Sequence, residues 1–235
     1  MLASSPPRSA AAMASAWLLH PAAKPVVFAV CLMPLAWLVW AAFTNGLGAN
    51  PAEALIRSLG DWTLRLLCAT LAITPLRTWL NVAALARYRR LLGLFTFFYG
   101  ALHFLAYSFF DMGWVWQDIV NDVAKRRFIL VGTAAWLLMV PLALTSFNRA
   151  IKAMGAARWQ WLHRLVYLTA LLGLLHFFWM RAGKNDFAEV AVYAVILAVL
   201  LGWRVVRRWR RPAAGRPAGA AARPGLTTRP SPLKP

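Results

Sequence analysis

The sequence predicts an all-α integral membrane protein, a bundle of six transmembrane helices with disordered termini. The first observation is composition: 61% of the 235 residues are hydrophobic, whereas soluble domains are usually about 45–50% apolar. The second is length, because apolar runs of about 18–20 residues recur and each can cross a hydrocarbon core roughly 30 Å thick. The third is the distribution of charge, which places most basic residues on one side of the expected membrane.

Six apolar runs are expected to form the transmembrane helices. They are long and rich in Leu and Ala rather than short and alternating, which favours helices over strands. Together they define one membrane domain over residues 26–206. The runs cover residues 26–43, 64–80, 92–110, 129–146, 164–180 and 188–206.

The segments between the runs differ in charge. With a cytoplasmic N-terminus and alternating helices, all seven acidic residues lie in or beside the outer loops, and nineteen of the 26 basic residues lie on the inner side. This positive-inside pattern predicts cytoplasmic N and C termini. It also explains the net charge of +19 without a nucleic-acid partner. The inner segments are 1–25, 81–91, 147–163 and 207–235, and the outer loops are 44–63, 111–128 and 181–187.

Both ends of the chain are expected to be tails. Residues 1–25 mix Ser, Ala and Pro and faintly resemble a signal peptide, but their apolar part is short, which favours an uncleaved cytoplasmic tail. Residues 207–235 are rich in Pro, Gly, Ala and Arg, a composition typical of disorder. This basic cytoplasmic tail would lie against anionic lipid of the inner leaflet.

Two histidines are placed at the same depth. His103 and His176 each lie thirteen residues from the expected inner end of their helix, near Arg90 and His163, which is about 20 Å along the axis. Two imidazoles from two helices at one level are what a bis-histidine haem requires. Apolar side chains that could form a wall around it, or could equally face lipid, are Phe97, Phe98, Phe104, Leu175, Phe177 and Phe178.

Other uses of these histidines are also considered. A zinc site would want a third or fourth ligand, and no Cys, Asp or Glu is expected at that depth. Histidines can also hydrogen-bond between helices and serve packing alone. His163 lies at the inner boundary, and a step of thirteen residues puts it roughly 220° around the helix from His176. It is therefore assigned to a separate site. Cys31 and Cys68 are expected to be buried packing residues.

Three stretches of sequence carry a family resemblance. They are "RYRRLLGLFTFFYGALHFLAY" (87–107), "PLALTSFNRAIKAMGAARWQWLHRLVYLTALLGLLHFFW" (141–179) and "TPLR" (74–77). Together they resemble the MsrQ (YedZ) family, the haem-binding membrane subunits of the MsrPQ periplasmic methionine sulfoxide reductase system. This family belongs with the ferric reductase-like transmembrane proteins. The resemblance runs from about residue 25 to residue 210.

The resemblance implies a function. Members of the family bind b-type haem, are associated with FMN, and lie in the bacterial inner membrane. They take electrons from the quinone pool or from a cytosolic flavin reductase and pass them to MsrP, a periplasmic molybdopterin enzyme. MsrP reduces methionine sulfoxide in oxidised periplasmic proteins. The three histidines of the family match His103, His163 and His176.

One position departs from the wider superfamily. Two-haem relatives often carry a second histidine fourteen residues before the first on the equivalent of helix three, and here that position is Arg89. Arginine binds carboxylate and phosphate well but is not an ordinary haem ligand. The inner site, with Arg89 and His163, could therefore hold a haem propionate, a flavin phosphate or a quinone. One or two haems are both compatible with this pattern.

The sequence is thus interpreted as an electron-transfer subunit rather than a catalytic subunit. After residue 206 only the tail follows, so a nucleotide-binding domain like that of a self-sufficient ferric reductase is not seen. The donor must then be membrane quinol or a separate protein. The alternatives are a stand-alone transmembrane ferric or quinone reductase, a non-redox transporter, and a membrane scaffold in which the histidines serve packing.

Overall fold

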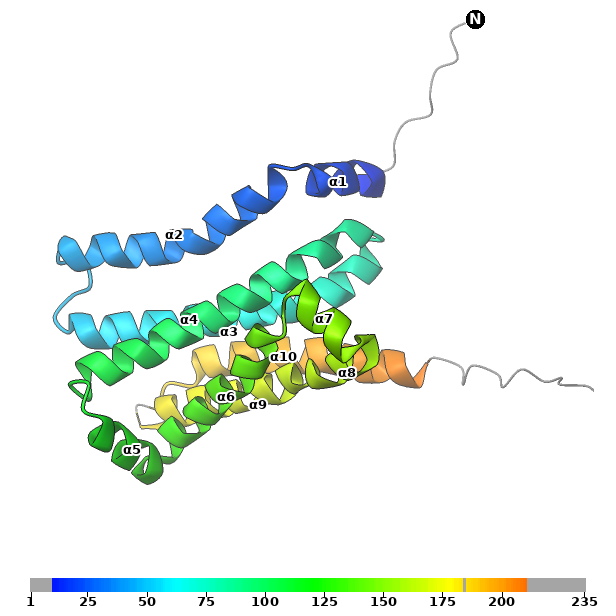
Figure 1. The fold of residues 1–235 in the computed structure, drawn as a ribbon. Coiled ribbons are helices and arrows are strands. Elements are labelled where there is room, and N and C mark those ends of the chain that lie inside the picture. Colours follow the sequence, from blue (N-terminus) through cyan, green and yellow to red (C-terminus); the bar gives the residue numbers. More distant parts are fainter. Residues whose placement is uncertain (1–9, 184, 211–235) are drawn as a thin grey trace, which may run out of the picture.

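The structure, a computed structural model, describes residues 10–183 and 185–210, and its regular elements there are all helices. Six of them are long and run side by side (Figure 1). Each of the six predicted apolar runs corresponds to one of these helices. They are α2 (Ala23–Phe43), α3 (Pro51–Trp79), α4 (Arg89–Phe110), α6 (Arg127–Leu144), α9 (Leu165–Ala182) and α10 (Ala188–Trp209).

Five helical stretches are long and apolar enough to cross a membrane. They include α2, α4, α6, α9 and α10. Helix α3 is longer than any of these, at 29 residues, but it is not among the five. Its first half carries four charged residues, Glu53, Arg57, Asp61 and Arg65.

The connecting segments contain more helix than the sequence predicted. The expected outer loop 44–63 is wrong in its second half, because α3 already begins at Pro51. Asn50 caps that helix by accepting a hydrogen bond from the Glu53 N–H at 3.2 Å, and a proline at the first helical position is favourable. The shorter helices are α1 (Ala10–Leu19), η1 (Ala83–Tyr88), α5 (Trp116–Lys125), α7 (Asn148–Met154) and α8 (Ala156–Leu162).

The two expected tails are partly helical where the structure describes them. Helix α1 lies within residues 1–25, and its Leu18 carbonyl accepts hydrogen bonds from Arg87 at 2.9 Å and from Tyr88 at 2.5 Å. Helix α10 continues to Trp209, so the expected disorder from residue 207 begins too early. The remainder of that prediction, residues 211–235, lies outside the described residues, as do residues 1–9.

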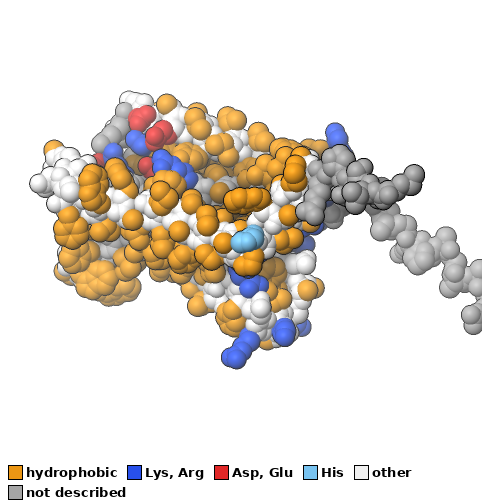
Figure 2. Space-filling model, turned by 90° about the horizontal axis from the view of Figure 1, so that it is seen from above, with side chains coloured by type: hydrophobic (Ala, Val, Ile, Leu, Met, Phe, Trp, Pro, Cys, Tyr) orange, Lys and Arg blue, Asp and Glu red, His pale blue; other side chains and the backbone are white. Residues whose placement is uncertain are grey.

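The helices alternate in direction, so that the connections gather at two ends of the bundle (Figure 1). The links α2–α3, α4–α5–α6 and α9–α10 lie at one end, which we call the acidic end because all seven acidic residues lie in these links, in the first three turns of α3 or in the first turn of α10. Figure 2 shows the red acidic side chains of the visible face gathered at this end. The opposite end, with η1, α7, α8 and the end of α10, is the basic end.

The sides of the bundle are apolar on their outer surface. On α10, Val192, Val195 and Val199 are each more than half exposed, and Figure 2 shows hydrophobic side chains over most of the visible face. Soluble proteins rarely expose apolar patches of this extent. The packing is closest between α3 and α4 and between α6 and α9.

Two helices contain a proline beside which a polar side chain from another helix hydrogen-bonds to the backbone. In α2, Pro34 cannot donate a backbone hydrogen bond. The fully buried hydroxyl of Tyr99 lies against this turn, where it accepts from Leu35 N–H at 3.1 Å and donates to the Cys31 carbonyl at 2.8 Å. In an α-helix these two backbone groups would pair with each other.

The second proline is Pro75 in α3, which leaves the carbonyl four residues earlier without its usual donor. That carbonyl belongs to Leu71, and it accepts a hydrogen bond from the guanidinium of Arg204 on α10. Arg204 also donates to the Leu200 carbonyl at 2.5 Å and lies over the ring of Tyr167, 5.7 Å from its centre. Arg204 therefore joins α10 to the turn of α3 that contains Pro75.

We predict that Tyr99→Phe destabilises the protein by about 1–2 kcal/mol, because it leaves a buried donor and a buried acceptor unpaired. The thermal unfolding midpoint in detergent checks this. The matched control is Tyr193→Phe, which removes only an exposed hydrogen bond from Arg65. Equal midpoints for the two variants would show that the hydroxyl of Tyr99 does not stabilise the turn at Pro34.

Candidate functional site

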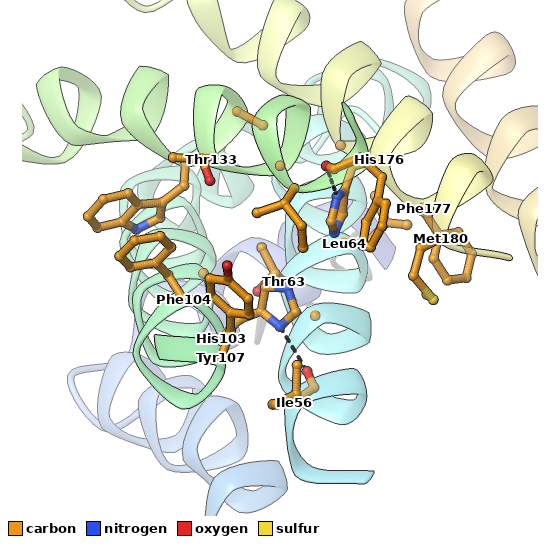
Figure 3. A pocket seen from close by; sticks show the side chains of 18 of the residues that line it. Ile56, Thr63, Leu64, His103, Phe104, Tyr107, Thr133, His176, Phe177 and Met180 are labelled. Carbon is orange, nitrogen blue, oxygen red and sulfur yellow. Dashed lines mark hydrogen bonds between the residues drawn. The ribbon is translucent and has the colours of Figure 1, made fainter. Parts of the chain in front are cut away.

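His103 on α4 and His176 on α9 face each other inside the bundle (Figure 3). Their ring centres are 6.1 Å apart, and the ring planes are inclined at 73°. The helices that carry them belong to different closely packed pairs, α3 with α4 and α6 with α9. The two rings thus meet across the gap between the pairs.

Each ring is fixed by a hydrogen bond from Nδ1 to a backbone carbonyl of the partner helix in its pair. His103 Nδ1 lies 2.8 Å from the Ile56 oxygen on α3, and His176 Nδ1 lies 2.7 Å from the Phe128 oxygen on α6 (Figure 3). A carbonyl can only accept, so Nδ1 must carry the proton in each ring. The Nε2 atoms then keep a free lone pair, which is the arrangement seen in most metal-binding histidines.

Two glycines make room for these rings. A Cβ atom on Gly132 of α6 would lie only 2.6 Å from His176 Nδ1, and one on Gly60 of α3 would lie 3.1 Å from His103 Cε1. The first distance is shorter than real Cβ contacts. Glycine at these positions therefore allows each imidazole to lie directly against the neighbouring helix.

The rings line a cavity of about 460 Å³ between the helix pairs. Its walls are largely apolar and include Leu64, Met180 and the parallel rings of Phe104 and Trp136, whose centres are 4.8 Å apart. Of the six apolar wall residues expected from the sequence, only Phe104 and Phe177 line it. The expectation is wrong for Phe97, Phe98, Leu175 and Phe178 because their helices turn these side chains elsewhere, and Phe98 and Phe178 are 37% and 41% exposed.

The cavity suits a metal held by two opposed imidazoles. A metal bonded to both Nε2 atoms at about 2.0 Å would place the two ring centres roughly 6 Å apart, close to the 6.1 Å observed. Within the described residues there is no group of three or more His, Cys, Asp or Glu side chains able to hold a metal ion. A site with two protein ligands in a long apolar cavity fits iron whose remaining ligands come from a porphyrin better than it fits zinc.

The cavity becomes polar toward the acidic end. Its lining there includes Arg57, Asp61, Tyr107, Asp111 and Arg126. The sequence predicts no carboxylate at the depth of the histidines, because residues 44–63 are expected to form a loop. Because α3 begins at Pro51, Asp61 instead lies on a helix that lines the cavity.

A hydrogen-bonded network closes this polar end. Tyr107 donates to the Asp122 carboxylate at 2.5 Å, and Arg126 forms an ion pair with the same carboxylate. Burial alone would raise the pKa of Asp122, but the hydrogen bonds from Arg126 and Tyr107 outweigh it and hold that pKa below its usual value. The network ties α4, α5 and the start of α6 together.

His163 and Arg89 lie toward the basic end and do not line the cavity. His163 stacks on Trp159 with ring centres 3.9 Å apart, and its Nδ1 lies 3.0 Å from the Trp159 carbonyl. Its Nε2 atom is buried and has no hydrogen-bond partner of good geometry, although the Leu142 carbonyl is near enough to act on the ring. Arg89, exposed at the start of α4, is near enough for its charge to act on His163. The structure therefore brings these two predicted residues into one region, while their role stays a prediction.

Sequence reasoning missed the residues that position the histidines. Backbone carbonyls of Ile56 and Phe128 carry no side-chain signal. Gly60 and Gly132 carry a weak one, because a small residue within an apolar helix often marks a close approach of two helices.

The chain is similar to known membrane proteins that are named for binding heme. The family model for "Ferric reductase like transmembrane component" matches residues 59–174. A heme-binding subunit MsrQ of protein-methionine-sulfoxide reductase from Polaromonas naphthalenivorans is 66% identical over 83% of this chain and 89% of its own. Subunits of the same name from Ralstonia nicotianae and Bordetella pertussis are 52% and 51% identical, over 85% and 82% of this chain and 92% and 93% of their own.

No solved structure matches the chain. The relatives nevertheless cover most of both sequences, and they share a name that fits a multi-pass membrane bundle with two opposed histidines. The chain therefore belongs to the MsrQ family of ferric reductase-like transmembrane proteins.

Proposed function

We propose that this chain is a membrane electron-transfer subunit that holds b-type haem between His103 and His176 and supplies electrons to a periplasmic methionine sulfoxide reductase, MsrP. The observation that carries the proposal is the opposed pair of imidazoles, each with Nδ1 anchored to a carbonyl and Nε2 free. The relatives support it, because they are named heme-binding subunits of that reductase.

The proposed arrangement has six spans in the bacterial inner membrane. Helix α3 would be the sixth span, since it runs alongside α4 over its length despite its charged first half. The basic end would face the cytoplasm with both termini, as the positive-inside rule requires, and the acidic end would face the periplasm. The haem histidines then lie nearer the periplasmic side, close to the partner.

The work of the chain would be to hold and insulate the cofactor. Bound haem supplies reversible one-electron chemistry at its iron. The Ile56 and Phe128 carbonyls orient the two imidazoles, and the apolar walls exclude water. Electrons would come from membrane quinol or a cytosolic flavin reductase.

A second redox group is proposed at the basic end. The buried, unpartnered Nε2 of His163 and the neighbouring charge of Arg89 support a site for an anionic group there, either FMN or a second haem. Such a group would receive electrons on the cytoplasmic side and pass them toward His103 and His176.

Helix α5 and the turn before it are proposed as part of the surface for MsrP. Trp114 and Trp116 are 58% and 71% exposed there, beside exposed charges of both signs at Asp118, Lys125 and Arg127. Exposed charges of this kind steer the encounter of two proteins. Asp122 and Arg126 in the same segment are engaged with each other.

The first test of this function removes the axial ligands. His103→Ala and His176→Ala should each abolish most of one low-spin b-type haem per chain, because the iron would keep only one weakly held protein ligand. The reduced-minus-oxidised absorbance spectrum and the haem content of the purified protein measure this. His20→Ala, an exposed histidine in the N-terminal segment, should leave the spectrum unchanged. Full low-spin haem in either axial variant would refute the pairing.

The second test addresses the positioning of His176. Gly132→Ala places a methyl group against Nδ1 and should break the bond to the Phe128 carbonyl, which we expect to weaken haem binding by about 10–100-fold. A haem titration of the detergent-solubilised protein measures the affinity. Gly93→Ala on α4 is the matched control, since its added Cβ would lie an ordinary 3.8 Å from Thr70. Equal affinities in the two variants would contradict the proposed role of Gly132.

The third test concerns the basic end. His163→Ala should lower any bound flavin and slow reduction of the haem by quinol, while the haem of His103 and His176 stays present and reducible by dithionite. Flavin and haem are quantified per chain, with His20→Ala again as control. If His163→Ala instead removes a second, spectroscopically distinct haem, the group at the basic end is a haem and the flavin assignment fails.

A further inference from the structure

The cavity around His103 and His176 has positive charge at one end only. Among its lining residues the cations are Arg57, from α3, and Arg126, at the junction of α5 and α6. Both lie at the acidic end, whereas the walls farther in are largely apolar. A ligand with an apolar body and an anionic edge would therefore fit in one orientation.

Arg126 has hydrogen-bonding capacity that the protein does not use. One terminal nitrogen of its guanidinium is engaged with Asp122, but the Nε atom is buried without any hydrogen-bond partner. A buried donor left unpaired destabilises a protein, because it has lost its hydrogen bonds to water. A group entering the cavity could accept from this Nε.

Arg126 also lies close to the residue that anchors His176. Its guanidinium lies over the ring of Phe128, 5.5 Å from the ring centre, and the Phe128 carbonyl is the group that holds His176. Arg57 lines the cavity from the opposite pair of helices and forms an ion pair with Glu53. The two arginines thus flank the mouth of the cavity.

A ligand with two negative charges on one edge would be neutralised by the two arginines, Arg57 and Arg126. Haem b carries two propionate carboxylates on one edge of an otherwise apolar ring. Three carboxylates, Glu53, Asp61 and Asp111, also line the cavity and would repel those of the haem. Arginine offers a charge-assisted and often bidentate hydrogen bond to a carboxylate, roughly twice as strong as a hydrogen bond between neutral groups.

We propose that Arg126 and Arg57 bind the two propionates of the haem held by His103 and His176, with Arg126 using its unpartnered Nε. This orients the propionate edge toward the acidic end. It also gives Arg126 two tasks, because the same guanidinium holds α5 through Asp122. The inference rests on the haem site proposed above.

The test is a chemical double-mutant cycle on the full-length protein in detergent. The haem-free chain and its variants are titrated with haem b and with haem dimethyl ester, in which both carboxylates are blocked. For the unaltered chain the ester should bind roughly 10–100-fold more weakly, the range expected for hydrogen bonds to charged groups. Arg126→Gln should weaken binding of haem b by a similar factor, and the penalty for the ester should shrink in that variant.

Two variants separate this role from a general loss of positive charge. Lys125→Gln removes an exposed positive charge from the end of α5, one that does not line the cavity. Arg181→Gln alters another arginine with a buried, unpartnered Nε, one that pairs with Asp186 and Glu189 and does not line the cavity. Both should bind haem b like the unaltered chain. The haem-loaded Arg126→Gln protein should also show a lower reduction potential than Arg181→Gln, since a positive charge near the haem is lost.

Three outcomes would overturn the proposal. They are an unchanged haem affinity in Arg126→Gln, an undiminished ester penalty in that variant, and a loss in Lys125→Gln equal to that in Arg126→Gln. Failure of the haem site itself looks different, because the unaltered chain would then bind neither haem b nor its ester as a low-spin species.

Discussion

Two hydrogen bonds from imidazole to backbone underlie the arrangement of this protein. His103 is held by α3 and His176 by α6, so each bond lies within one of the two closely packed helix pairs. Each pair therefore orients its own imidazole ring, and the cavity lies where the two pairs meet. Gly60 and Gly132 serve the same end, because each lets a ring lie against the helix that anchors it. Orientation of the rings is built into the protein rather than imposed by a ligand.

A few polar contacts also determine how the apolar helices pack against one another. Unpaired backbone groups are expensive away from water, and prolines create them within helices. Tyr99 and Arg204 each bring a side chain from another helix to such a place, at Pro34 and Pro75. These contacts do more than satisfy bonds, since they fix how α2 and α10 pack against the central helices. The turns of α2 and α3 that contain proline are thus held by side chains of neighbouring helices.

The sequence predicted the helices and the level of the histidines but little of their surroundings. Long apolar runs and a thirteen-residue step along each helix are readable without coordinates, and they brought His103 and His176 to one depth. The cavity wall was not readable, because it depends on how each helix is rotated about its axis. Phe98 and Phe178 face outward for that reason. The start of α3 was missed because charged residues hide a helix from a search for apolar runs, and with it Asp61 was missed as a cavity residue.

The division of the site between two helix pairs has a consequence for the life of the protein in the cell. A group bound by one residue from each helix pair links the two pairs, and its binding free energy adds to the stability of the folded state. A chain without that group should therefore open more readily along the cavity, so that the cofactor contributes to the stability of the fold as well as to its colour.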